Sequence, residues 1–252
     1  MVELESQDNH KPRERISPEL LWSKYSVIQQ LIFWFVGLAA WHGLNWIGAN
    51  YERFTLPIWR YVSTFRSYFY TGNMQGMILL GTFCGLAILG LLVLTDYIIA
   101  RSKNEKPAKH ILRNYYLLPR TNKQRYIALF VGINAGIFEE LFFRGALYIL
   151  FFILTGSVVL GVLFTAILFA ILHAPIQGWY SSLWIFLVGI FLNILMLQTE
   201  SYYASIFCHI VINIGNLFLI PAMLEEELED LLLQDPDSNN PSRLQSSTSS
   251  LF

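Results

Sequence analysis

Three charged side chains lie close together within a long apolar stretch of the sequence. They are Glu139, Glu140 and Arg144, in the segment IFEELFFRGAL. On insertion scales, each such charge at the centre of a membrane helix costs about 2.5–3.5 kcal/mol, so a compensating interaction is required. Glu140 and Arg144 are four residues apart, which places both side chains on one helix face and allows an ion pair. This ion pair would leave the Glu139 carboxylate unpaired and available for a reaction. The alternative is that both carboxylates pair with Arg144 in a purely structural role between helices.

Two further apolar stretches carry one histidine each. His173 ends the segment VLFTAILFAILH, and His209 lies in IFCHIVINIGN, with Asn213 one helical turn later. A carboxylate and an imidazole can polarise and deprotonate a water molecule, while a second imidazole and an amide N–H can stabilise the resulting oxyanion. These residue types therefore indicate hydrolysis. The alternative is that each histidine is a hydrogen-bonded packing residue.

The same side chains could also bind a metal ion. Glu139, His173 and His209 could supply a site of two histidines and one carboxylate for zinc, with water as the fourth ligand. The sequence contains no HExxH helix. We therefore favour a metal-free water activated by Glu139, with no cofactor, and keep zinc as the variant.

Membrane helices must position these polar residues. The chain is 54% hydrophobic and only 14% charged, and only four charged side chains occur between Tyr126 and Met223. Such a stretch cannot cover a protein surface in water, which excludes a water-soluble globular enzyme. With Cys84 and Cys208 as the only cysteines, a disulfide scaffold is excluded as well. The net charge of -1 gives no reason to expect nucleic acid as a partner.

The apolar runs are long enough for about six membrane spans. A bilayer core about 30 Å thick needs roughly 20 helical residues. The predicted spans are about 27–49, 75–100, 126–153, 157–173, 182–198 and 203–223. The expected fold class is all-α: a polytopic membrane helix bundle of about six transmembrane helices around an intramembrane cavity, with the lipid bilayer as its surroundings.

The predicted division of the chain follows composition and charge. It comprises a cytoplasmic N-terminal segment (1–26), two spans with an interfacial segment and a basic loop (27–125), a membrane core (126–223) and an acidic, Ser-rich disordered tail (224–252). The first part is polar and of mixed charge, so we expect no signal peptide. The loop 101–125 holds eight Lys and Arg residues, and basic loops resist translocation. We therefore expect this loop and both termini on the cytoplasmic side.

Straight spans would keep the two histidines apart. His173 would lie at the cytoplasmic end of its span, and His209 about six residues below the outer end of its own. That arrangement separates them by about 15 Å in depth, too far to share a water molecule. Pro175 and Gly178 follow His173 and would let the chain turn inside the protein. We therefore expect tilted or broken helices around a chamber.

Three motifs occur in order along the predicted core. Glu139-Glu140-Leu-Phe-Phe-Arg144 has the pattern EExxxR, Phe169-Ala-Ile-Leu-His173 has FxxxH, and His209-Ile-Val-Ile-Asn213 has HxxxN. Together they resemble the motifs of the CPBP family of intramembrane proteases, also called the ABI family. This family covers the type II CAAX prenyl endopeptidases and bacteriocin-processing or immunity proteins. The resemblance covers roughly 126–223.

This resemblance implies a glutamate-dependent intramembrane endopeptidase. Glu139 would be the general base that activates water, assisted by His173, and His209 with Asn213 would form the oxyanion hole. In the same pattern Glu140 and Arg144 would be the supporting ion pair, and Phe169 would pack. The implied substrate is a membrane-associated peptide or protein, lipidated in the CAAX manner or not. The chain length and compact motif spacing look like the prokaryotic branch, which implies a multi-pass protein of a prokaryotic cell membrane.

Two functions of other classes compete with the endopeptidase. A non-catalytic membrane scaffold or regulator would use the same fold without turnover. A small transporter or proton relay would also suit a membrane glutamate beside two histidines. The sequence shows no inverted repeat with interrupted helices, which disfavours the transporter.

Overall fold

The computed structural model of this chain describes residues 72–106 and 121–227. Outside these ranges it describes residues 28, 30–32, 34–39, 42, 108, 118 and 119. The predictions for the N-terminal segment 1–26, the interfacial segment, most of the basic loop and the tail beyond Glu227 lie outside the described residues. Nearly all described residues are helical, and none of them forms a strand.

From α6 onward the helices follow one another directly or after two residues. The labelled helices are α4 (Met74–Ser102), α6 (Asn122–Glu140), η3 (Leu141–Leu147), α7 (Tyr148–Thr155), α8 (Val158–Thr199), α9 (Tyr202–Ile214), η4 (Gly215–Leu219) and α10 (Ile220–Met223). An apolar helix Gln30–Ala39 precedes them. The segments η3 and η4 are π-helical, and each continues directly from the α-helix before it.

Helix length and composition fit a membrane protein. Helices long and apolar enough to cross a bilayer are Met74–Ser102, Asn122–Phe152, Ser181–Thr199 and Tyr202–Met223, and Gln30–Ala39 and Val158–Ala174 are shorter apolar helices. Large apolar side chains are exposed on the outside of the bundle; Leu79 and Phe83 of α4, for example, are about 70% exposed. Such surfaces suit lipid and not water. The expectation of an all-α membrane helix bundle is therefore confirmed.

Polar residues between the apolar runs determine where the helices begin and end. Thr121 and Gln124 form a capping box at the start of α6, each bonding to the other's backbone N–H. Gly156, with φ 65°, ends α7 in the left-handed region that favours glycine. Ser157 and Ser201 accept backbone N–H bonds at the starts of α8 and α9.

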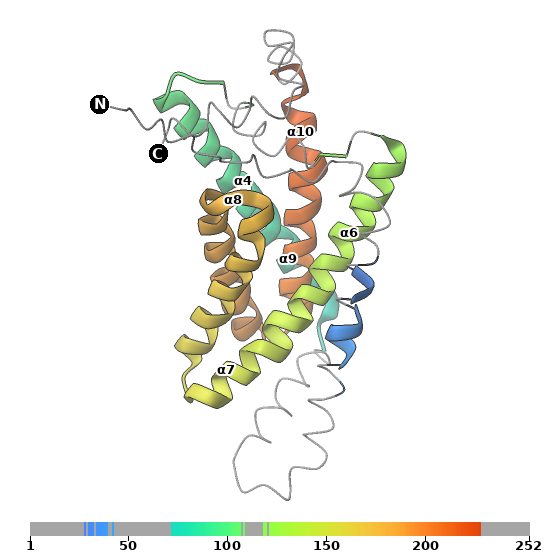
Figure 1. Ribbon diagram of the computed structural model, residues 1–252, viewed down its shortest axis with the longest axis vertical. Coiled ribbons are helices and arrows are strands. Elements are labelled where there is room, and N and C mark those ends of the chain that lie inside the picture. Colours follow the sequence, from blue (N-terminus) through green and yellow to red (C-terminus); the bar gives the residue numbers. More distant parts are fainter. Residues whose placement is uncertain are drawn as a thin grey trace, which may run out of the picture.

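Helix α8 folds back on itself. Helical structure is continuous from Val158 to Thr199. In a straight helix Thr165 and Asn193 would lie about 40 Å apart, yet their side chains are 3.4 Å apart. The chain therefore reverses between Ala174 and Ser181, and Figure 1 shows the two limbs side by side. This is the stretch where Pro175 and Gly178 led us to expect a turn.

Helix α9 lies at the centre of the bundle, between α4 and α6 (Figure 1). It runs parallel to α4, because Gly81 faces the Ala204 backbone and Gly85 faces the Cys208 carbonyl. On its other side, Gly136 faces Ile210. Closer to the start of α6, Gly132 faces Asn213, so α6 and α9 are antiparallel. Glycines bring both neighbours of α9 close to its backbone.

Helix α9 begins inside the bundle. Ser201 and Tyr202 are fully buried, and the Tyr202 hydroxyl lies beside Gly145 of η3. His209 follows Tyr202 by seven residues, and Glu139 precedes Gly145 by six. Because α9 runs antiparallel to α6 and η3, the side chains of His209 and Glu139 lie at the same level of the bundle. The 15 Å separation calculated for straight spans does not occur, because that calculation placed the start of α9 at the membrane surface.

Candidate active site

The structure brings Glu139, His173 and His209 together. Glu139 lies near the end of α6, His173 on the first limb of α8 and His209 on α9. Glu139 precedes the Gly156 turn by seventeen residues and His173 follows it by seventeen, so the hairpin places them at equal depth. The Nε2 atom of each histidine lies 3.8 Å from Oε2 of Glu139. One carboxylate oxygen therefore faces two imidazoles.

The Glu139 carboxylate is buried yet incompletely bonded. The residue is 8% exposed, and its Oε2 has no hydrogen-bond partner among the residues that the structure describes. A distance of 3.8 Å to each imidazole is too long for a direct hydrogen bond. Buried polar atoms are normally hydrogen-bonded, so an unbonded carboxylate oxygen calls for an explanation; what distinguishes Oε2 of Glu139 is that it also faces two imidazoles.

The neighbouring Glu140 is bonded through one of its two carboxylate oxygens, while its Oε2 has no hydrogen-bond partner among the described residues. Its Oε1 lies 2.9 Å from Nη1 of Arg144 and 2.8 Å from Nδ1 of His209. Glu140 and Arg144 are 0% exposed, at the i, i+4 spacing seen in the sequence. One carboxylate oxygen thus links α6 and η3 to α9. The sequence indicated the ion pair, but it contained no signal for the bond to His209.

Both imidazoles are oriented through Nδ1. His173 Nδ1 lies 2.7 Å from the Phe169 carbonyl oxygen, one helical turn earlier. A carbonyl only accepts, so Nδ1 of His173 carries a proton, and in the neutral imidazole its Nε2 presents a lone pair. In the same way, the Glu140 carboxylate accepts from Nδ1 of His209. In each histidine Nε2 is the atom directed at Glu139.

Phe169 forms the apolar wall of this cluster. Its ring centroid lies 4.6 Å from that of His173 and 5.7 Å from that of His209. The Arg144 guanidinium carbon lies 4.7 Å from the same ring, and Phe143 meets it edge to face. Phe169 is 3% exposed. It therefore packs against both imidazoles and against the buried cation.

Asn213 is turned toward a different partner. It lies on α9 one turn after His209, just before η4, and its Nδ2 donates to the Gly132 carbonyl at 3.2 Å. Gly132 lies seven residues before Glu139 on α6. The structure therefore places Asn213 beside the cluster, and does not bring its amide nitrogen to the Glu139 carboxylate.

A second polar group adjoins Arg144. The guanidinium Nη2 donates to the Gly189 carbonyl at 3.3 Å, and Asn193 Nδ2 donates to the same oxygen at 2.8 Å. Sequence reasoning missed both residues. The available signal was a polar Asn193 in the apolar run FLNILML, since a buried amide must find partners.

The zinc variant requires a suitable set of ligands. Among the described residues, no three His, Cys, Asp or Glu side chains are arranged to hold a metal ion. Glu139, His173 and His209 converge, but they converge on one carboxylate oxygen with 3.8 Å contacts. In this arrangement the three residues do not fit a zinc site.

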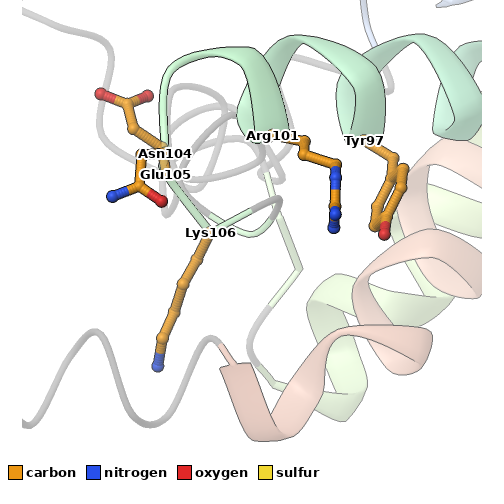
Figure 2. Close-up of a pocket in the computed structure, with 5 residues that line it drawn as sticks. All are labelled: Tyr97, Arg101, Asn104, Glu105 and Lys106. Atoms are coloured by element: carbon orange, nitrogen blue, oxygen red, sulfur yellow. The ribbon is translucent and has the colours of Figure 1, made fainter.

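A separate cavity lies away from these residues. It has a volume of about 520 Å³ and is lined by Tyr97, Arg101, Asn104, Glu105 and Lys106 at the end of α4. Figure 2 shows Tyr97 and Arg101 side by side on the helix, and Asn104, Glu105 and Lys106 just beyond its end. Arg101 lies sixteen residues beyond Gly85, which packs at the level of Cys208. The cavity is therefore about 24 Å along α4 from the histidine cluster.

Comparison with known families agrees with the motifs. Residues 121–215 match the family model described as type II CAAX prenyl endopeptidase Rce1-like. No curated protein and no solved structure matches the chain. The matched segment contains α6, η3, α7, α8 and α9 and so every residue of the cluster. The match over residues 121–215 supports the resemblance of this segment to the CPBP family of intramembrane proteases and indicates a multi-pass membrane peptidase of the CAAX endopeptidase type.

Proposed function

We propose that this protein hydrolyses a peptide bond of a membrane-associated substrate with a water molecule activated by Glu139. The observation that carries the proposal is the buried Glu139 Oε2, which has no hydrogen-bond partner in the described part of the chain and faces two Nε2 atoms at 3.8 Å. These distances let one water molecule hydrogen bond to Oε2 of Glu139 and to Nε2 of His173. A general base must lie within this reach of the proton that it removes.

Glu139 and His173 divide the work of activation. His173 Nδ1–H is held by the Phe169 carbonyl, so its Nε2 accepts a hydrogen bond from the water. Glu139 takes the second proton as the water oxygen bonds to the carbonyl carbon. The carbonyl electron pair moves onto its oxygen. When the C–N bond breaks, the departing amine takes the proton from Glu139, giving a carboxylic acid and an amine.

His209 is the principal donor to the oxyanion. The cluster holds two carboxylates and one guanidinium, so one imidazolium makes it neutral, and a buried neutral cluster is less costly than a charged one. Protonated His209 donates from Nε2, while Glu140 accepts from its Nδ1 at 2.8 Å. Preorganised donors of this kind lower the barrier most when their partners are already fixed. Glu140 and Arg144 supply that fixation.

Asn213 is the second oxyanion donor in this scheme. One N–H of its amide bonds to the Gly132 carbonyl, which sets the plane of the amide. The other N–H is the one we assign to the oxyanion. We expect Asn213 to stabilise the oxyanion less than His209 does, because its amide nitrogen already donates to the Gly132 carbonyl of α6.

The orientation in the membrane follows from charge. We infer that the loop 101–125, with its eight Lys and Arg residues, and both termini face the cytoplasm of a prokaryotic cell. The substrate then reaches the cluster from the membrane. His173 is the most accessible of the three converging residues, with 24% of its side chain exposed.

The test is cleavage of a farnesylated peptide that ends in a CAAX sequence, by purified protein in detergent micelles. Glu139→Gln should lower kcat by about 10²–10⁴-fold, the usual contribution of a general base. The matched control is Glu200→Gln, which changes the exposed carboxylate between α8 and α9 and should retain activity within twofold.

Two results would contradict the proposal. One is full activity of folded Glu139→Gln protein, which would remove the general base. The other is a folded wild-type protein that leaves the peptide intact, which would favour a non-catalytic scaffold or a different substrate class. If the peptide stays intact, quantitative proteomics of membranes from cells expressing wild type or Glu139→Gln separates a scaffold from a peptidase with another substrate. Only a peptidase produces peptide termini that depend on Glu139.

A further inference from the structure

Two fully buried polar side chains join the limbs of α8. Thr165 on the first limb is 1% exposed, and Asn193 on the second limb is 0% exposed. Thr165 Oγ1 lies 3.4 Å from Asn193 Oδ1 and is also within hydrogen-bond distance of two carbonyls of its own helix. Neither residue belongs to the three motifs. Buried polar groups in a membrane helix are costly, which calls for a functional explanation.

The second limb approaches the first at Gly189. A Cβ at this position would lie 3.3 Å from Ala166, so a larger residue would push the limbs apart. Asn193 Nδ2 donates to the Gly189 carbonyl at 2.8 Å, one turn back along the helix. The same oxygen accepts from Nη2 of Arg144 at 3.3 Å.

Arg144 has few other contacts that fix its orientation. In the described part of the chain its guanidinium bonds to Glu140 through Nη1 and to Gly189 through Nη2, and its Nε has no partner. The guanidinium carbon lies 4.7 Å from the centre of the Phe169 ring, a contact without the direction of a hydrogen bond. The Gly189 carbonyl, together with Oε1 of Glu140, therefore fixes the orientation of the guanidinium.

We propose that Asn193 is a positioning residue for the peptidase reaction. It directs the Gly189 carbonyl onto Arg144, Arg144 holds the Glu140 carboxylate, and Glu140 orients the imidazole of His209. Asn193 contacts no reacting group and acts through this series of hydrogen bonds. The inference rests on the proposed function, since it explains how the oxyanion donor is held.

The test is the kinetics of Asn193→Leu with the farnesylated CAAX peptide. Leucine has a similar size and suits an apolar helix, but it cannot bond to the Gly189 carbonyl. We expect kcat to fall about tenfold with KM within twofold of wild type, because a mispositioned donor affects the transition state and not substrate binding. Asn193→Ser keeps a donor that can reach the same carbonyl and should recover most of kcat.

Asn134→Leu is the matched control. Asn134 is also a buried asparagine whose Nδ2 bonds to a carbonyl one turn earlier, that of Phe130, at 2.7 Å. That bond does not involve Arg144. The control should therefore keep kcat within twofold of wild type.

A double-mutant cycle tests the route through Arg144. Arg144→Lys keeps the positive charge but lacks the two-armed guanidinium. In that background Asn193→Leu should change kcat by less than twofold. If Asn193 acts through Arg144, the effects of the two substitutions on kcat are not additive. A tenfold loss in both backgrounds would overturn the proposal, as would wild-type kcat for folded Asn193→Leu.

Glu139→Gln in the same assay separates the two proposals. If Glu139→Gln is inactive while Asn193→Leu is fully active, only the positioning role fails. If Glu139→Gln is active, the proposed function fails and the positioning role fails with it. Equal losses in Asn193→Leu, Asn193→Ser and Asn134→Leu would indicate a packing role and would also overturn the proposal.

Discussion

Helix α9 contacts α4 on one side and α6 on the other, and the two contacts differ in chemistry. Toward α4, Gly81 and Gly85 lie directly on the backbone at Ala204 and Cys208. Toward α6, the contact includes the buried bond from His209 to Glu140. Small residues let two helices approach closely but fix no side-chain direction. The charged contact also fixes the direction of the His209 imidazole, at the cost of burying ions.

Glu140→Gln should have the largest effect, because it breaks the charged contact. Arg144, at 0% exposure, would face a neutral amide, and a buried unpaired charge costs about 3–5 kcal/mol of unfolding free energy. Thermal unfolding in detergent measures the loss, and peptide cleavage should fall with it. The double variant Glu140→Met with Arg144→Met should regain most of the stability and remain inactive. An active double variant would show that the ion pair serves packing alone.

Asn213→Ala should have the next largest effect, on activity and not on stability. Removing one oxyanion donor costs about 10²–10³ in kcat, and we expect the lower end because the amide also bonds to Gly132. The measurement is kcat for the farnesylated peptide, together with the unfolding midpoint. Unchanged kcat would restrict the oxyanion hole to His209.

Gly81→Ala should act on the other side of α9. Its new Cβ would overlap the Ala204 carbonyl oxygen, and overpacking of this kind costs about 1–3 kcal/mol. Activity per folded molecule should persist, since no charged group moves. The control is Gly90→Ala on the same helix, where a Cβ meets nothing within 4 Å. A loss of activity without a loss of stability would contradict the division between the two contacts.

Metal removal should have the smallest effect. Protein stripped of metal and assayed in excess chelator should keep kcat within twofold, because the proposed mechanism activates water through Glu139 and His173 alone. Elemental analysis of the stripped sample provides the control. Loss of activity that zinc restores would instead assign Glu139, His173 and His209 as metal ligands.

Several features of the site could be predicted from the sequence. Apolar run lengths indicated the spans, and the i, i+4 spacing indicated the pair of Glu140 and Arg144, because both depend on local helix geometry. The contact between Glu140 and His209 joins residues 69 positions apart, and no local rule predicts it. The π-helical η3 was also not predicted, although such segments often occur at functional sites.

The sequence by itself determined the chemistry available to this protein: one carboxylate beyond the ion pair, two imidazoles and an amide, held in apolar helices that no aqueous surface could accommodate. The tertiary structure decided which of two adjacent glutamates is bonded to Arg144 and His209 and which faces the Nε2 atoms of both histidines. Glu140 is bonded to Arg144 and His209, while Glu139 Oε2 has no hydrogen-bond partner among the described residues. The physical reason is the buried start of α9, which brings His209 to the level of both carboxylates.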